Sequence, residues 1–341
     1  MLYSKQKNVV INCQQTGGGF LLPYISDPDT STRELVEALA SICPERFRSL
    51  PDSFNGRILL CPDVRPDRVN VIVSAGGGCH PLSYGYLGDG MADACINGNR
   101  RCAPSAYDIY EAALKIGSSS GNLLLYNNYM GDYLNNDLAA ELLSLEHIPC
   151  ALCGATDDCL SAPPGAPRGE RGGQTGLLYL IKIASACARA GSSLEEVSRI
   201  AHKANERMST LAVTMDYERQ LVHLGEGFSG EPPVSTHADC FSIEGIAELS
   251  FDTLCRDLKP APSEKIYMMV SRMTLTHPED AYILASRIKQ CAGPLHPVGR
   301  VDAGFYTNLY HAQGFLITFL CADRELEQYL QGRFYSDTFS F

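Results

Sequence analysis

The sequence predicts an α/β protein made of two α/β domains, each with a mainly parallel or mixed sheet flanked by helices. Two apolar runs, residues 69–73 and 123–126, are typical of buried strands in a parallel sheet. A helical pattern at residues 106–116 separates them, which is the order of a crossover connection. A second alternation of strands and helices follows from about residue 211. Such alternation with short loops favours sheets covered by helices.

The elements are expected in the following order. Residues 1–24 form an N-terminal extension. The first domain, residues 25–195, opens with a helix that a capping box, Ser31 to Glu34, starts and Pro44 ends. Its remaining elements are expected at residues 58–61, 69–73, 106–116, 123–126 and 175–190. The second domain, residues 196–341, is expected to contain most of a helix at residues 194–208. Further helices are expected at 243–258 and 279–292, and strands at 266–270 and 315–321.

Length and composition limit the class of protein. A chain of 341 residues with 45% hydrophobic residues can bury a full core. Its net charge of −11 argues against nucleic acid as a partner, because nucleic acid needs clustered Lys and Arg. No apolar run is long enough for a membrane span and no leader pattern is present, so we expect a cytoplasmic protein with no membrane partner. The 14 cysteines are scattered, which indicates reduced thiols.

Glycines after the 69–73 strand form the first candidate ligand site. Gly76, Gly77 and Gly78 would let the backbone turn sharply and bring its N–H groups close to a ligand with several oxygens. His80 follows closely and could contact the same ligand. The stretch matches neither a dinucleotide fingerprint nor a Walker A loop. The alternative is that the triple glycine only forms a tight turn and binds no ligand.

The next buried strand ends in a second set of polar residues. Asn127, Asn128 and Asp132 follow residues 123–126, and we expect the next helix to open at Asn136 or Asp137. The carboxyl ends of parallel strands are where ligands bind in open sheets. Asp132 is therefore a candidate general base that takes a proton from a substrate hydroxyl. The alternative is that Asp132 is only a helix cap or turn residue.

Together these stretches resemble the K subunit, or K domain, of dihydroxyacetone kinases. In that family a strand ends in a Ser-Gly-Gly-Gly-Ser-Gly-His-Glu-Pro-like loop, and residues 74–81 here read SAGGGCHP. The family's Asn-Tyr-Thr-Gly-Asp-x-x-Asn-Phe-Asp is similar to residues 128–137, NYMGDYLNND. The resemblance extends to residues 85–88, 169–172, 224–232 and 298–320, so only the first twenty-odd residues lack a counterpart.

The resemblance implies roles for individual residues. Asp132 would deprotonate the substrate hydroxyl, His80 would orient the substrate by a hydrogen bond, and the amides of Gly77 and Gly78 would hold its oxygens. The glycine loop is one residue shorter than in the family, so either His80 or Cys79 can match the family's hydrogen-bonding histidine. We favour His80, because the glycines then align naturally.

Two departures from the family pattern lie in the second domain. The family's histidine in Gly-Ile-His-Gly-Glu-Pro forms a covalent hemiaminal with a substrate ketone, and Ser229 stands at the matching position. A serine hydroxyl is a poor nucleophile without an adjacent base, so we expect Ser229 to offer only a hydrogen bond. Weaker discrimination against non-ketones such as glycerol should follow. The family's Asn-Gly-Leu-Gly-Gly-Thr turn has become SRMTLT at residues 271–276, without its glycines.

The resemblance also implies partners. A K unit binds a short ketose such as dihydroxyacetone, while a separate L subunit or L domain carries ATP or ADP with Mg²⁺. This sequence has no phosphate loop, so we expect no cofactor bound by this chain. We expect no metal either, because the C-x-x-C at residues 150–153 has no second pair. The family suggests a homodimer.

Two functions remain open. The first is the substrate-binding subunit of a dihydroxyacetone (glycerone) kinase-type phosphotransferase acting on a small ketose or related polyol. Phosphoryl transfer depends mostly on positioning and electrostatics, so a lost covalent tether can be tolerated. The rival is a catalytically retired ligand sensor or co-activator with the same fold. Asp132 and His80 favour catalysis, whereas Ser229 and the altered turn at Met273 favour the sensor.

Overall fold

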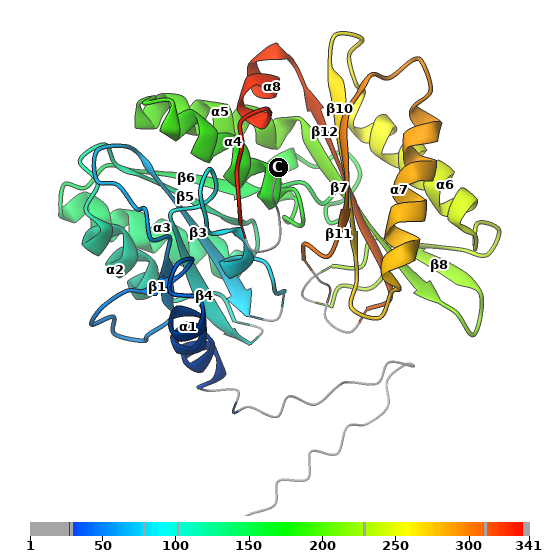
Figure 1. The fold of residues 1–341 in the computed structure, drawn as a ribbon. Coiled ribbons are helices and arrows are strands. Elements are labelled where there is room, and N and C mark those ends of the chain that lie inside the picture. Colours follow the sequence, from blue (N-terminus) through cyan, green and yellow to red (C-terminus); the bar gives the residue numbers. More distant parts are fainter. Residues whose placement is uncertain are drawn as a thin grey trace, which may run out of the picture.

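Two six-stranded sheets, surrounded and separated by helices, make up the protein (Figure 1). The computed structural model describes residues 27, 30–77, 79–100, 102–227, 230–307, 309 and 312–336. Both sheets are flanked by helices, so the predicted α/β class is confirmed. None of the helices in these ranges combines the length and the apolar character that crossing a membrane requires.

The first sheet is largely parallel and has the strand order β1-β2-β4-β3-β5-β6. Neighbours among β4, β3, β5 and β6 pair in parallel, whereas β1 and β2 pair antiparallel at one edge. β5 is buried along its whole length, as the apolar runs in the sequence predict. The strands are β1 (Arg48–Ser49), β2 (Ile58–Leu60), β3 (Asn70–Gly77), β4 (Ala94–Arg100), β5 (Asn122–Asn127) and β6 (Cys150–Ala155).

Five helices belong to the first sheet. α2 and α3 pack on one of its faces, and α4 and α5 pack on the other. Ser193 caps α5 by accepting a hydrogen bond from the backbone N–H of Glu196, as predicted. The helices are α1 (Ser31–Ile42), α2 (Ala106–Ile116), α3 (Met130–Leu145), α4 (Leu177–Arg189) and α5 (Leu194–Glu206).

Two predicted helix starts are wrong. α1 has Thr30 at its N-cap instead of Ser31, and the Thr30 hydroxyl donates to Glu34 Oε1 over 2.7 Å. α3 begins at Met130, so Asn136 and Asp137 lie inside the helix. The first turn of this helix contains a glycine and an aspartate, residue types that in a sequence are typical of loops. An acidic residue is nevertheless favourable there because of the partial positive charge at a helix N-terminus.

The second sheet is mixed and has the order β11-β10-β12-β7-β8-β9. β10 and β11 pair in parallel, and the remaining neighbours pair antiparallel. Helices α6 (Ile243–Leu258) and α7 (Pro278–Ala292) pack on one face of it. The strands are β7 (Met208–Asp216), β8 (Leu221–Leu224), β9 (Ser235–His237), β10 (Lys265–Arg272), β11 (Val298–Gly304) and β12 (Gly314–Ala322).

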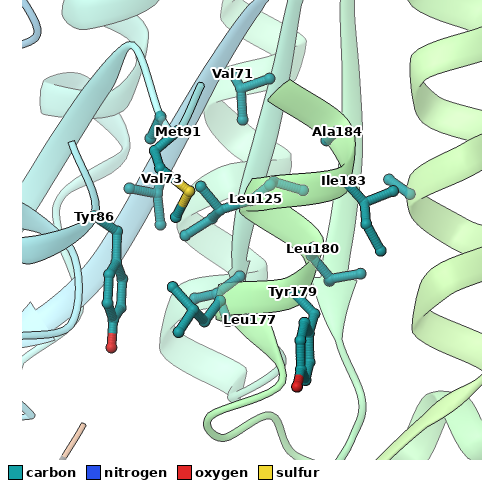
Figure 2. Close-up of a cluster of buried hydrophobic side chains, with 14 of the residues drawn as sticks. Val71, Val73, Tyr86, Met91, Leu125, Leu177, Tyr179, Leu180, Ile183 and Ala184 are labelled. Carbon is teal, nitrogen blue, oxygen red and sulfur yellow. The ribbon is translucent and has the colours of Figure 1, made fainter. Parts of the chain in front are cut away.

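The largest apolar core is centred on α4. Figure 2 shows Leu177 and Leu180 of α4 beside Val73 of β3 and Leu125 of β5, and all four side chains are buried. The same core includes buried residues on one face of the second sheet and in α8 (Arg324–Leu330). Its members there are Met208, Tyr267, Met269, Leu320, Ala322, Leu326 and Leu330. The division expected between residues 195 and 196 falls inside α5, whose buried residues belong to this core.

A fully buried carboxylate joins the two sheets next to this core. Asp157 follows β6 and accepts hydrogen bonds from the backbone N–H groups of Gln174 and Gly176, each over 2.8 Å. It also accepts a bond from the hydroxyl of Thr210 on β7. Gly176 precedes α4, so a single side chain ties β6, the start of α4 and β7 together.

Candidate active site

A cleft of about 570 Å³ opens where the carboxyl ends of β3 and β5 face the segment that follows β8. Its first wall comes from the first sheet and includes Gly77, Cys79, Asn127, Tyr129 and Asp132. Its second wall comes from the second domain and includes Glu226, Gly227, Gly230, Glu231 and Leu309. The structure therefore brings together the two sequence stretches singled out in the first domain and the segment around Ser229.

The glycine stretch is strand rather than turn as far as Gly77. β3 continues through Gly76 and Gly77, with an irregular pairing to β4 between Ala75 and Gly77. A Cβ on Gly77 would lie 2.6 Å from the carbonyl oxygen of Asn99. The sharp turn expected from Gly76 is thus wrong for these two glycines, which are needed because another backbone comes close. Gly78 lies outside the described residues.

Asp132 lies in the first turn of α3 and lines the first wall. Burial raises the pKa of its carboxyl to about 7, opposed in part by its own backbone N–H. Its Oδ1 atom is buried and has no hydrogen-bond partner among the described residues. A carboxylate with this pKa and an unused oxygen can accept a proton near neutral pH.

A buried amide fixes the backbone of Asp132. The side-chain nitrogen of Asn136 donates to the carbonyl of Asp132 over 2.8 Å and to the hydroxyl of Ser74 over 2.9 Å. Asn136 is fully buried, and Ser74 lies on β3. The first turn of α3 is thereby tied to the strand that carries the glycines.

Cys79 lies in the cleft, whereas His80 is not among the residues that line it. Burial raises the pKa of the Cys79 thiol to about 12, and the charge of Asp132 adds to this increase. The His80 ring instead lies with its centroid 5.0 Å from that of Tyr84, and burial lowers the pKa of the imidazole. The structure thus brings Cys79 and Asp132 to one cavity, and a role for His80 stays a prediction.

Hydrogen bonds connect the second domain to the backbone of Cys79. The hydroxyl of Thr307 donates to the carbonyl oxygen of Cys79 over 3.1 Å. Ser271 at the end of β10 accepts hydrogen bonds from the backbone N–H groups of Tyr306 and Thr307, at 3.0 and 3.2 Å. A chain of hydrogen bonds therefore leads from β10 to the cleft.

The altered turn after β10 lies beneath the cleft. Met273 is fully buried and packs with Ala212, Leu309 and Leu316. Leu309 in turn lines the cleft. Ser229 lies outside the described residues, but its neighbours Gly227 and Gly230 line the second wall.

Sequence reasoning missed one acidic residue of this region, Asp158. A second cavity of about 710 Å³ shares Tyr129, Gly227 and Glu231 with the cleft. Asp158 lines this cavity, and burial raises the pKa of its carboxyl to about 7. Asn128 holds its edge by donating to the carbonyls of Gly169 and Arg171, at 2.9 and 2.8 Å. The available signal for Asp158 was its position three residues after the end of β6.

Comparison with known proteins identifies the family. The fold and site define a two-sheet α/β protein with a half-buried acid where strands end at a cleft, and residues 51–336 match the model of the Dak1 domain. The chain therefore belongs to the Dak1 domain family, which confirms the resemblance seen in the sequence.

Relatives with named activities share a quarter to a third of their aligned residues with this chain. An L-erythrulose kinase of Pectobacterium atrosepticum is 27% identical over 327 residues, covering 89% of this chain and 54% of the relative. A D-erythrulose kinase of Mycolicibacterium smegmatis is 30% identical over 290 residues, covering 80% and 49%. A dihydroxyacetone-binding subunit of Listeria innocua is 29% identical over 236 residues, covering 65% and 70%. The chain spans about half the length of the two erythrulose kinases.

Solved structures share the fold. The dihydroxyacetone kinase of C. freundii superimposes with a TM-score of 0.81 at 22% identity, covering 93% of this chain and 60% of that one. A dihydroxyacetone kinase operon co-activator superimposes with a TM-score of 0.80 at 21% identity, covering 89% and 97%. At these identities the likeness establishes the arrangement of elements.

Proposed function

We propose that the chain is the substrate-binding unit of a kinase for a small ketose or related polyol, and that it works with a separate nucleotide-carrying L-type unit. The observation that supports this most is Asp132, a half-buried carboxylate whose pKa burial raises to about 7, with a buried oxygen that has no partner among the described residues. Named kinases among the relatives, including erythrulose kinases and a dihydroxyacetone-binding subunit, point to the same chemistry.

In the proposed reaction, Asp132 accepts the proton of a substrate hydroxyl while the hydroxyl oxygen attacks the γ-phosphorus of ATP. The bond from that phosphorus to the β,γ-bridging oxygen breaks, and ADP is the leaving group. ATP or ADP with Mg²⁺ is held by the L-type unit. The amides of Gly77 and Gly78 hold substrate oxygens, and His80 or Cys79 orients the substrate. Ser229 contributes a hydrogen bond. Such a reaction depends on positioning, which a preformed cleft supports, and on neutralising charge, which the Mg²⁺ of the L-type unit would supply.

The chemistry of the cleft favours a neutral substrate. Asp132, Glu226 and Glu231 line it, and none of the described lining residues is Lys, Arg or His. Carboxylates accept hydrogen bonds from hydroxyl groups and repel anions. A neutral ketose or polyol therefore suits the cleft better than an acidic sugar, and a phosphorylated product is repelled from it.

Two measurements test this function together. Calorimetry follows binding of dihydroxyacetone and erythrulose, and a coupled assay with ATP and a dihydroxyacetone-kinase L subunit follows phosphoryl transfer. We expect Asp132→Asn to reduce transfer about 10²–10⁴-fold, because a positioned general base contributes that much, while binding is largely kept. Asp137→Asn, on the same helix and outside the cleft lining, is the matched control and should retain transfer. Transfer that is unchanged in Asp132→Asn contradicts the assigned role.

The second candidate is a ligand sensor or co-activator without catalysis. It is favoured by Ser229 at the position of the family's covalent histidine, and a co-activator with this fold is known. Ligand binding to the parent chain without transfer, with L units from several kinases, would support this candidate over the kinase. Absence of binding by every small ketose and polyol would exclude both.

A further inference from the structure

The turn between β9 and α6 gathers three side chains of different chemistry. His237 ends β9, and Asp239 and Cys240 follow it before α6 begins. One potential ligand atom from each of the three lies within 4.8 Å of those of the other two. His237 and Cys240 are half-buried and Asp239 is exposed, so the group is accessible from solvent. None of the three lines the cleft described above.

The donor set indicates which ion suits the group. An imidazole nitrogen, a thiolate sulfur and a carboxylate oxygen together are typical of Zn²⁺ sites, whereas Mg²⁺ and Ca²⁺ prefer oxygen ligands alone. Zinc bonds of about 2.0–2.3 Å in tetrahedral geometry place ligand atoms about 3.3–3.6 Å apart. Ligand atoms within 4.8 Å of one another would have to come closer by at most about 1.5 Å to reach this spacing. A water molecule completes four-coordination.

The surrounding structure holds this turn in place. The hydroxyl of Ser235 lies 3.0 Å from Nε2 of His237, and such a contact orients a ligand imidazole. The backbone N–H of Ser242 donates to the carbonyl of Cys240 over 2.8 Å. A Cβ on Gly245 would lie 2.8 Å from the Cα of Cys240, so Cys240 packs directly on the first turn of α6.

We propose that His237, Asp239 and Cys240 bind Zn²⁺, and that the ion fixes the end of the segment forming the second wall of the cleft. That segment leaves β8 after Leu224 and returns at Ser235, and these two residues pair across β8 and β9. The zinc site would join the end of β9 to the start of α6. Its first ligand, His237, lies two residues after Ser235. The proposed ion would hold these two elements together, and the proposal does not depend on the proposed function.

Metal titration tests the site directly. Zn²⁺ is titrated into the metal-free chain in competition with a chromophoric chelator, and Co²⁺ is used as a spectroscopic substitute. We expect one Zn²⁺ per chain and a thiolate-to-cobalt charge-transfer band. His237→Ala and Cys240→Ala should each weaken binding by roughly 100-fold or more. Ser235→Ala should weaken it about tenfold, as expected for a residue that only orients a ligand.

Controls separate this site from other thiols. Cys291→Ala removes a half-buried cysteine from α7 and should leave both affinity and the cobalt band unchanged. Far-ultraviolet circular dichroism checks that each variant is folded, and Asp239→Asn provides a milder change that keeps the thiol. Absence of a thiolate band in the parent chain overturns the proposal. Retention of the band and of zinc affinity in Cys240→Ala does the same.

Discussion

The two walls of the cleft differ in how closely they follow the pattern of the family. The first wall keeps the Asn-Tyr-x-Gly-Asp motif at residues 128–132, and Asp132 is half-buried in the first turn of α3. In the segment of the second wall, the sequence has Ser229 where the family pattern has its covalent histidine, and the turn beneath this wall buries Met273. Under the proposed function, the group that would accept a proton is present, while the histidine that would capture a ketone is absent.

Under the proposed function, this difference means that proton transfer and substrate capture depend on separate structural units. Asp132 depends on β3 and α3, through Ser74 and Asn136. The second wall depends on β8, β9 and β10. One unit can therefore change its residues while the other keeps its geometry, provided that contacts such as Thr307 to Cys79 still join them.

The largest expected effect comes from restoring the second wall. Ser229→His supplies an imidazole where the family has its nucleophile, and we expect it to form a reversible adduct with dihydroxyacetone that the parent does not form. Native mass spectrometry should detect one added ketose per chain. Ser229→Ala is the control and should show none. A Ser229→His chain that binds the ketone without an adduct would mean that residue 229 does not reach the carbonyl.

A smaller effect concerns the first wall and pH. In the folded state the pKa of Asp132 is raised from 3.8 to about 7, so between these pH values the folded chain holds a proton that the unfolded chain has lost. The free energy of unfolding therefore falls as pH rises through this window. Asp132→Asn removes the cost of ionising this carboxyl in the folded chain. The variant should therefore be more stable than the parent at pH 8, by on the order of 2 kcal/mol. Urea unfolding at pH 8 and pH 5 measures this gain, which should shrink at the lower pH.

The same measurement on Asp137→Asn provides the comparison on the same helix. A gain for Asp132→Asn that is equal at both pH values would contradict a raised pKa. Loss of stability at pH 8 would contradict it more strongly, since it would show that the carboxylate is stabilised in the folded state.

The smallest effect tests the link between the walls. Thr307→Val keeps the shape of the side chain and removes the hydrogen bond to Cys79, which should lower the free energy of unfolding by about 1 kcal/mol. Thr214→Val is the matched control, because the buried hydroxyl of Thr214 has no partner among the described residues. Denaturant titration should find the control neutral or slightly stabilised. Equal changes in the free energy of unfolding for both substitutions would contradict a stabilising hydrogen bond between the two walls.

The sequence predicted elements best where local preference and burial agree. Residues 69–73 and 123–126 are apolar runs that became the centres of β3 and β5. β4 was not predicted, because its residues 97–99, Asn-Gly-Asn, are typical of a turn. In the structure Asn97 is buried and accepts a hydrogen bond from Ser83 over 2.6 Å, so tertiary contacts outweigh the local preference.

Reasoning from strand ends predicted only the first wall of the site, whereas the segment around Ser229 in the second wall came from the resemblance alone. Asp132 and Cys79 follow two strands close in sequence, and the rule that strand ends meet at one edge placed them together. Glu226 and Leu309 reach the cleft from separate parts of the second domain, so no short motif contains them with Asp132. The expected positions of Gly78 and Ser229 lie outside the described residues.

The core around α4 has a consequence for the cooperativity of unfolding. Interfaces between domains of one chain permit relative motion unless they are large and hydrophobic, and here buried side chains of both sheets share one apolar cluster. Rotating one sheet away from the other would expose Met208, Met269 and Leu320 to water. The chain should therefore melt as a single thermodynamic unit, and the two walls should stay in register without the entropic cost of closing a hinge each time a ligand binds.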